Sequence, residues 1–212
     1  MIENLIQLIQ RKFESEGTGH DWFHINRVIQ TALYIQKKEG GDQTVVHYAA
    51  LLHDIDDHKF NGGDFSKGGK VAKELIKDHS LSESQHDNIV NIVKTISFKG
   101  SGEDDTMDTL EGKIVQDADR LDAIGAIGIA RTFAYGGSIG QPIYIPGIGP
   151  KENQTKEEYL GQRSHTINHF YEKLLLIGDL MKTKTGTQLA RERTEYMKAY
   201  LNRFLKEWDG FN

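Results

Sequence analysis

Apolar residues recur at intervals of three and four over most of the chain, which is the spacing of one face of an α-helix. The first such stretch covers residues 2–13 and ends before Gly17 and Gly19, the second runs from about residue 20 to Gly40, and the third runs from Thr44 to Asp57. Further helices are predicted over residues 71–79, 85–98, 110–125, 156–177 and 183–208. The pattern therefore predicts an all-α protein.

One segment departs from this pattern. All three prolines fall within the glycine-rich residues 136–150, a loop that is too long and too apolar for a simple connector. We expect a lid or a packed excursion there, with a short strand-like piece at 143–145. No repeat or linker divides the chain, so residues 1–212 are expected to form a single-domain helical bundle with a Gly/Pro-rich loop insertion. Its core would cover about 20–135, with C-terminal helices 156–209 packed on it.

Composition narrows the class of partner. The chain has 212 residues, enough for one well-packed core, and a formal net charge of -5. That charge excludes duplex nucleic acid as a partner but allows a small phosphorylated molecule. There is no cysteine, so a metal would take nitrogen and oxygen ligands. No window approaches about 18 consecutive apolar residues, and we expect a cytoplasmic protein without a membrane partner. A homodimer is an open alternative.

The sequence at 49–58 brings an apolar helix into a group of imidazoles and carboxylates. Ala49, Ala50, Leu51 and Leu52 are followed at once by His53, Asp54, Asp56, Asp57 and His58. Such polar groups are costly to bury unless they hold a cation or pair with each other. A metal site is the interpretation that we favour. On a helix that continues to Asp57, this carboxylate would lie one turn beyond His53.

Two other stretches supply candidate partners for this cluster. His24 and Arg27 share a helix face, which would also include His20 if the helix has begun there. Farther along, the segment 117–122 carries three aspartates and is followed by the small residues of 123–130, so its carboxylates are expected to face inward. Arg131 then has two open interpretations, an ion pair with one of these aspartates or a contact to a substrate phosphate.

The predicted helix 156–177 carries His165 and His169 one turn apart, with Lys173 one turn further. No carboxylate except Glu172 stands near enough to complete a metal site. We interpret His169 as a residue that contacts the substrate or supports the site, and His165 as a surface residue.

The order His24, His53-Asp54, Asp119 resembles the H…HD…D signature of the HD superfamily of metal-dependent phosphohydrolases, over most of residues 20–135. The resemblance implies a helical bundle in which these four side chains hold one divalent ion, which activates water and neutralises phosphate charge. Two imidazoles and two carboxylates suit Mn²⁺, our first expectation, or Mg²⁺, Co²⁺, Ni²⁺ or Fe²⁺.

Finer similarities bear on the reaction. The run Asp117-Ala118-Asp119-Arg120-Leu121-Asp122 is similar to the metal-aspartate segment of HD nucleotide hydrolases, which implies that Asp119 is a ligand and Arg120 a phosphate contact. Asp57 matches the position of a proposed general acid/base, so Asp54 and Asp57 are the expected catalytic residues. The expected substrate-binding residues are Arg27, Arg120, Arg131, His169 and Lys173.

Gly19-His20-Asp21, the run HDIDDHKF and the run DADRLDAIGAIGIARTF are similar to small bacterial HD pyrophosphohydrolases. These act on nucleoside triphosphates, so a monophosphate and pyrophosphate are the products implied. One alternative is a guanosine tetraphosphate-type hydrolase, although His58 stands where that group has an acidic residue. Others are a phosphodiesterase, which would need further histidines for a second metal, and a non-catalytic, metal-stabilised ligand-binding module.

Overall fold

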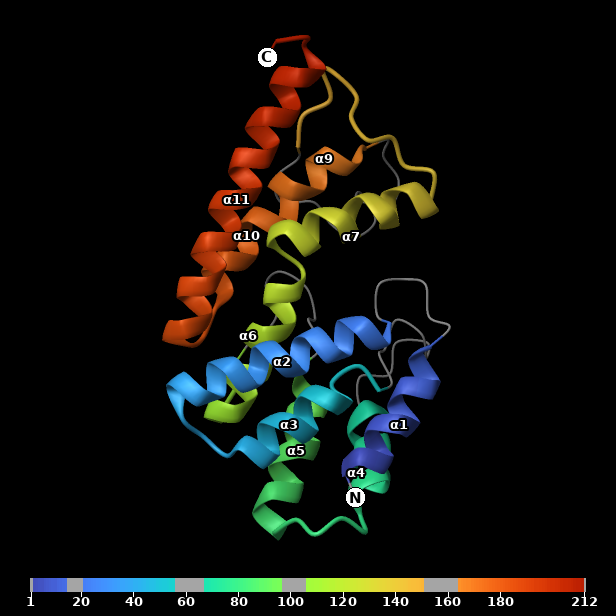
Figure 1. The fold of residues 1–212 in the computed structure, drawn as a ribbon, viewed down its shortest axis with the longest axis vertical. Coiled ribbons are helices and arrows are strands. Elements are labelled where there is room, and N and C mark those ends of the chain that lie inside the picture. The colour runs from blue at the N-terminus through green and yellow to red at the C-terminus, as the bar shows by residue number, and fades with distance from the viewer. Residues whose placement is uncertain (1, 15–20, 56–66, 97–105, 151–163, 212) are drawn as a thin grey trace. The chain divides into compact units, whose positions relative to one another are not determined.

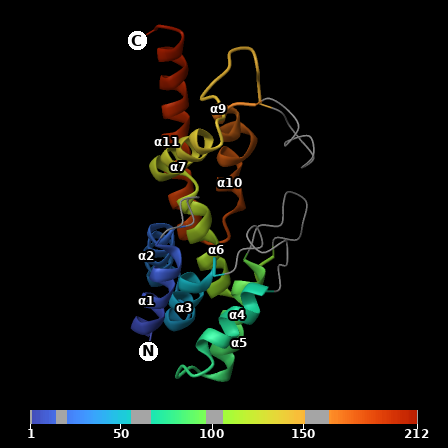
Figure 2. The ribbon, with the colours of Figure 1, turned by 90° about the vertical axis from the view of Figure 1, so that its right-hand side faces the viewer.

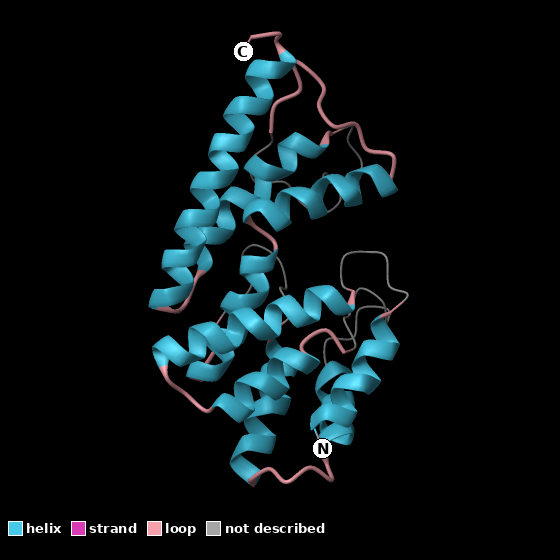
Figure 3. Cartoon of the chain, viewed as in Figure 1, coloured by secondary structure: helices cyan, strands magenta, loops and turns pink. Residues whose placement is uncertain are grey.

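The computed structural model describes residues 2–14, 21–55, 67–96, 106–150 and 164–211 (Figure 1). Helices dominate these ranges, and none of the described residues forms a β-strand (Figure 3). The all-α class predicted from the sequence is confirmed. The chain divides into two compact units, one of residues 1–119 with 182–185 and the other of residues 120–181 with 186–212. No helix in the described ranges has the length and apolar content needed to cross a membrane.

The first unit contains five helices and most of a sixth. They are α1 (Ile2–Phe13), α2 (Trp22–Glu39), α3 (Gln43–Leu52), α4 (Lys67–Ile76), α5 (Glu83–Thr95) and α6 (Leu110–Asp122), whose last turn passes into the second unit. Helix α3 packs against both α2 and α5, and α5 also packs against α4 (Figure 2). Fully buried side chains such as Ile25, Leu52, Ile89 and Ile114 fill the space between these helices.

Polar side chains start three of these helices. Asp21, Asp42 and Ser82 each accept hydrogen bonds from main-chain N–H groups in the first turn of α2, α3 and α5. Ser82 and Gln85 form a reciprocal capping box. Such caps stabilise a helix by about 1 kcal/mol each. Because Asp21 is the cap and α2 begins at Trp22, the condition under which His20 would share a helical face with His24 is not met, and His20 itself lies outside the described residues.

The predicted extension of the third helix to Asp57 is also wrong. Helix α3 ends at Leu52, and His53 is its C-cap residue. The N–H of Ile55 donates to the carbonyl of Leu52 at 3.0 Å, a three-residue turn in place of the four-residue helical bond. The expected position of Asp57 one turn beyond His53 required a helix that continues to Asp57, and α3 ends before it. Asp57 and His58 lie outside the described residues.

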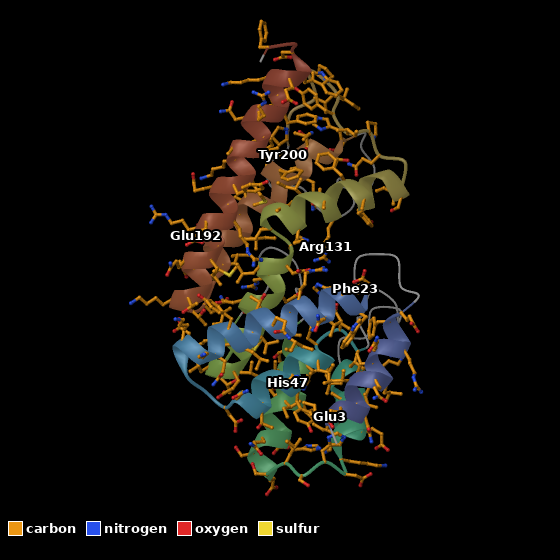
Figure 4. All side chains as sticks on the ribbon, in the orientation of Figure 1. Glu3, Phe23, His47, Arg131, Glu192 and Tyr200 are labelled. Carbon is orange, nitrogen blue, oxygen red and sulfur yellow. The ribbon has the colours of Figure 1, made fainter. Side chains whose placement is uncertain are left out.

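The second unit is built from α7 (Gly125–Ser138), a helical run over residues 166–180 and α11 (Lys184–Trp208), whose first two residues belong to the first unit. The run joins α9 (Thr166–His169), the π-helical η2 (Phe170–Leu174), α10 (Leu175–Ile177) and the 3-10 turn η3 (Gly178–Leu180). A helix was predicted from Lys156 onward, but residues 164–165 are not helical, so this part of the prediction is wrong. Residues 151–163 lie outside the described ranges. Aromatic rings of Phe133, Phe170, Tyr200 and Phe204 pack between these elements. Figure 4 labels Tyr200, which lies on α11.

The described part of the proline-containing loop packs against the start of α9. This agrees with the expected packed excursion, one of the two alternatives for this loop. The N–H groups of Thr166 and Ile167 donate to the carbonyls of Pro142 and Ile143 at 2.9 and 3.1 Å. The first N–H groups of a helix have no partner within it, and here the loop provides their acceptors. The expected strand-like piece at 143–145 is wrong, because these carbonyls bind a helix start and no neighbouring strand.

Candidate metal centre

Four side chains from three elements of the first unit converge on one point. His24 lies in the first turn of α2, His53 caps the end of α3, Asp54 follows it in the turn, and Asp119 lies in α6. The early end of α3 places His53 and Asp54 at a helix terminus, where side chains can project beyond the packed helix. The structure therefore brings together the four residues predicted as metal ligands.

The donor atoms are close enough to surround one ion. The Nε2 atoms of His24 and His53 lie 3.2 Å apart. Asp54 Oδ2 lies 3.4 Å from His24 Nε2 and 3.5 Å from His53 Nε2, and Asp119 Oδ1 lies 3.5 and 3.7 Å from the same two atoms. Ligands about 2.1 Å from an ion and about 90–110° apart lie roughly 3.0–3.4 Å from each other. The observed spacing is close to this range.

The protonation pattern of His53 also fits a metal. Its Nδ1 lies 2.8 Å from the carbonyl oxygen of Ala50, which can only accept, so Nδ1 carries the hydrogen. In the neutral ring Nε2 then has a lone pair that points toward the cluster. A hydrogen bond of this kind is the usual way in which a protein orients a ligating imidazole. The geometry therefore favours a cation that both Nε2 atoms can coordinate.

Charge and burial lead to the same conclusion. The side chains of both histidines are 1 % exposed, whereas those of Asp54 and Asp119 are 12 % and 37 % exposed. Two neutral imidazoles and two carboxylates carry a charge of about -2, which a divalent ion cancels. The imidazoles thus form the buried side of the candidate site, and Asp119 is the most exposed of its four side chains.

The predicted substrate residues are less well defined. Arg27 lies on α2 one turn after His24 and is half-buried, and its contact with a phosphate stays a prediction. Asp57, the expected general acid/base, lies outside the described residues. Arg120 belongs to the second unit, where its Nη1 donates to the carbonyl of Leu180 at 2.6 Å. This bond gives Arg120 a structural role, and its phosphate contact stays a prediction.

For Arg131 the ion-pair interpretation is confirmed. Its Nη1 donates to Asp122 Oδ2 at 2.7 Å and to the carbonyl of Asp122 at 3.2 Å. Arg131 is labelled in Figure 4. Arg193, which the sequence did not single out, donates to the carbonyl of Leu121. Burial lowers the pKa of Arg193, and the nearby Asp122 opposes that shift. Both guanidinium groups therefore bind carbonyls at the C-terminus of α6, where positive charge is favourable. A substrate contact of Arg131 stays a prediction.

The two histidines of the second unit differ from each other. Burial lowers the pKa of His169 to about 4, with a smaller contribution from the charge of Lys173, so His169 is neutral at pH 7. Contacts of His169 and Lys173 with substrate stay predictions. The interpretation of His165 as a surface residue is wrong, because its side chain is fully buried. His165 Nε2 donates to Ile148 O at 2.8 Å, and Nδ1 accepts from the N–H of Asn168, which caps α9.

Comparison with known proteins identifies the family. The sequence model described as "HD domain" matches residues 22–124. A crystal structure of an HD-superfamily hydrolase from Bacillus thuringiensis is 38% identical, with a TM-score of 0.78, and the match covers 98% of this chain and 96% of that one. The Bacillus subtilis protein YpgQ is 34% identical over 99% of this chain and 95% of its own length. The crystal structure of YpgQ in complex with ADP has a TM-score of 0.72, at 35% identity over 95% of this chain and 97% of that one. With a cluster of His24, His53 and Asp119, and with Asp54 in contact with both imidazoles, the chain belongs to the HD superfamily of metal-dependent phosphohydrolases.

Proposed function

We propose that this chain hydrolyses nucleoside or deoxynucleoside triphosphates to a monophosphate and pyrophosphate, with one divalent ion held by the four-residue cluster. The observation that carries the proposal is the close approach of four side chains. The Nε2 atoms of His24 and His53 lie 3.2 Å apart, and carboxylate oxygens of Asp54 and Asp119 lie 3.4–3.7 Å from these nitrogens. The ADP complex of YpgQ supports a nucleotide as the substrate class, because that relative covers nearly the whole chain. Mn²⁺ is the metal that we expect first.

A divalent ion bound at this site would neutralise phosphate charge and make water a stronger nucleophile. The protein's contribution begins with orientation. The Nδ1–H of His53 is fixed on Ala50 O, so its Nε2 lone pair is directed to the cluster before substrate arrives. Asp57 would accept or donate the proton that moves between water and the leaving group. Arg27, Arg120, Arg131, His169 and Lys173 are the proposed contacts to substrate.

Neutral His169 is chemically suited to bind a substrate oxygen through a hydrogen bond. With a pKa of about 4 it does not add a second positive charge beside Lys173 at pH 7. The neutral ring can still donate one hydrogen bond to a phosphate or sugar oxygen. In this proposal the positive charge of Lys173 attracts the substrate, and the hydrogen bond from His169 orients it.

A panel of nucleotides assayed with several metals tests the proposal. Wild-type protein with Mn²⁺, Mg²⁺, Co²⁺ or Ni²⁺ is incubated with nucleoside and deoxynucleoside triphosphates, ADP, guanosine tetraphosphate and cyclic nucleotides, and phosphorus NMR identifies the products. We expect pyrophosphate and a monophosphate from triphosphates, and no turnover by the Asp119→Ala control. Tripolyphosphate would place the attack at the sugar-phosphate ester. Preferential cleavage of guanosine tetraphosphate or cyclic nucleotides would replace the proposal by those activities, and binding without any turnover would indicate a ligand-binding module.

A further inference from the structure

Asp117 has a buried carboxylate that the proposed chemistry does not use. It lies two residues before the ligand Asp119 on α6, and its side chain is fully buried. Its Oδ1 accepts from the N–H of Lys182 at 2.8 Å. Its Oδ2 accepts from the N–H of Thr183 at 2.8 Å and from the Thr183 hydroxyl at 2.7 Å. Asp117 thus binds a segment that is 65 residues away in the sequence.

These three hydrogen bonds lie within the first unit, to which residues 182–185 belong. The same short segment has a second anchor, because Thr185 N–H donates to Glu39 Oε1 at 2.6 Å. Hydrogen bonds to an ionised, buried carboxylate are stronger than bonds between neutral groups. The segment 182–185 is therefore held in place by two anchors, and through Asp117 it fixes one side of α6.

Asp119 needs such a support more than the other ligands. Among the described residues its side chain contacts His24 and His53, and it is 37 % exposed, the largest value among the four ligands. Residues two apart on an α-helix point about 200° away from each other around the axis. Asp117 therefore holds the flank of α6 opposite to Asp119. A carboxylate about 6 Å from the axis moves by about 1 Å if the helix turns by about 10°.

We infer that Asp117 is a positioning residue for Asp119, fixing the rotation of α6 through its bonds to Lys182 and Thr183. The inference rests on the metal site of the proposed function. A ligand displaced by about 1 Å no longer fits the geometry that a metal requires, since functional groups must be held to within about 0.5 Å and 10–20°. Loss of residues that orient metal ligands typically weakens metal affinity by about 10–100-fold.

Metal affinity distinguishes positioning from stability alone. Calorimetric titration of metal-free protein with Mn²⁺ gives the dissociation constant, and thermal melting of the same samples gives stability. We expect Asp117→Asn to weaken Mn²⁺ binding by about 10–100-fold and Thr183→Val to weaken it by a smaller factor. Thr183→Ser keeps the hydroxyl and should bind as wild type does. Glu39→Ala is the matched comparison: it removes the other anchor of the same segment but keeps the bonds of Asp117, so it should lower the melting temperature and weaken Mn²⁺ binding less than Asp117→Asn does.

Because Thr183→Val removes only one hydroxyl, it keeps the test decisive if Asp117→Asn does not fold. Wild-type affinity in a folded, less stable Thr183→Val, or an equal loss of affinity in Glu39→Ala, would overturn the inference. Absence of Mn²⁺ binding by the wild type would overturn the metal site and this inference together. Failure of the nucleotide assay alone would overturn the proposed substrate and leave the positioning role standing.

Discussion

Arg131 binds the side chain and the main chain of the same residue, Asp122, at 2.7 and 3.2 Å. The Asp122 side chain is 5 % exposed, and that of Arg131 is 24 % exposed. The contact joins the end of α6 to α7 and satisfies a carbonyl that the helix leaves without an internal partner. The pair therefore stabilises the turn between these two helices.

Replacing Arg131 by methionine tests this role. The substitution leaves a buried carboxylate without its ion-pair partner, which typically costs about 3–5 kcal/mol. Because Arg193 also lies near Asp122, we expect a loss of about 3 kcal/mol in the free energy of unfolding, measured with urea. The matched control is Arg203→Met, which breaks the exposed pair of Arg203 with Glu207. Equal effects of the two substitutions would contradict a stabilising role of the buried pair.

The low pKa of His169 predicts a loss of stability in acid. An unfolded histidine has a pKa of about 6.5, so between pH 6.5 and 4 the unfolded chain takes up a proton that the folded chain does not. Stability due to this group is fully present above pH 6.5 and falls as the pH decreases. The loss at pH 5 is about 2 kcal/mol relative to pH 7. Thermal melting at both pH values should show a smaller pH effect in His169→Gln than in the wild type, and an identical effect would refute the assignment.

Two adjacent glycines of α7 predict opposite effects of alanine. A Cβ at Gly136 would collide with the hydroxyl of Thr166, whereas a Cβ at Gly137 would meet no atom within 4 Å. Gly136→Ala should therefore destabilise the protein by about 1–3 kcal/mol through overpacking. Gly137→Ala should raise stability by up to about 1 kcal/mol, because alanine favours the helix. Melting temperatures that shift in the same direction for both variants would contradict the close approach of α7 to α9.

Asp57 remains the predicted general acid/base. A positioned acid or base typically contributes about 10²–10⁴-fold to the rate, so Asp57→Asn should lower kcat by this factor. Because Asp57 is not among the four proposed metal ligands, the variant should keep its metal and change KM only modestly. Steady-state kinetics and metal content are measured on the same preparation. Turnover at the wild-type rate, or loss of the metal together with activity, would remove Asp57 from the catalytic residues.

The sequence predicted those features that depend on neighbours along the chain. The periodicity of apolar residues located α1, α2, α5 and α11 nearly at their observed bounds, because one buried face requires that spacing. The inward direction of the aspartates in 117–122 followed from the cost of burying carboxylates beside small residues, and Asp117 and Asp122 are buried.

What the sequence missed depends on partners far away in the chain. The bonds of Asp117 to Thr183 and of Arg193 to Leu121 span 66 and 72 residues. His165 looked like a surface residue because its partner Ile148 lies in the proline-containing loop. The end of α3 was placed too late because an apolar periodicity continues to Ile55, although the chain had already turned after Leu52. Neither propensity nor spacing carries this tertiary information.

The metal content of purified protein tests the central claim most directly. Wild-type protein is incubated with Mn²⁺, desalted and analysed by plasma mass spectrometry together with Asp54→Ala, Asp119→Ala and the control His58→Ala. Because His24, His53, Asp54 and Asp119 form one cluster, we expect about one ion per chain in the wild type and in His58→Ala, and a large loss in both aspartate variants. Wild-type protein without metal, or unchanged metal content in both aspartate variants, would contradict the account.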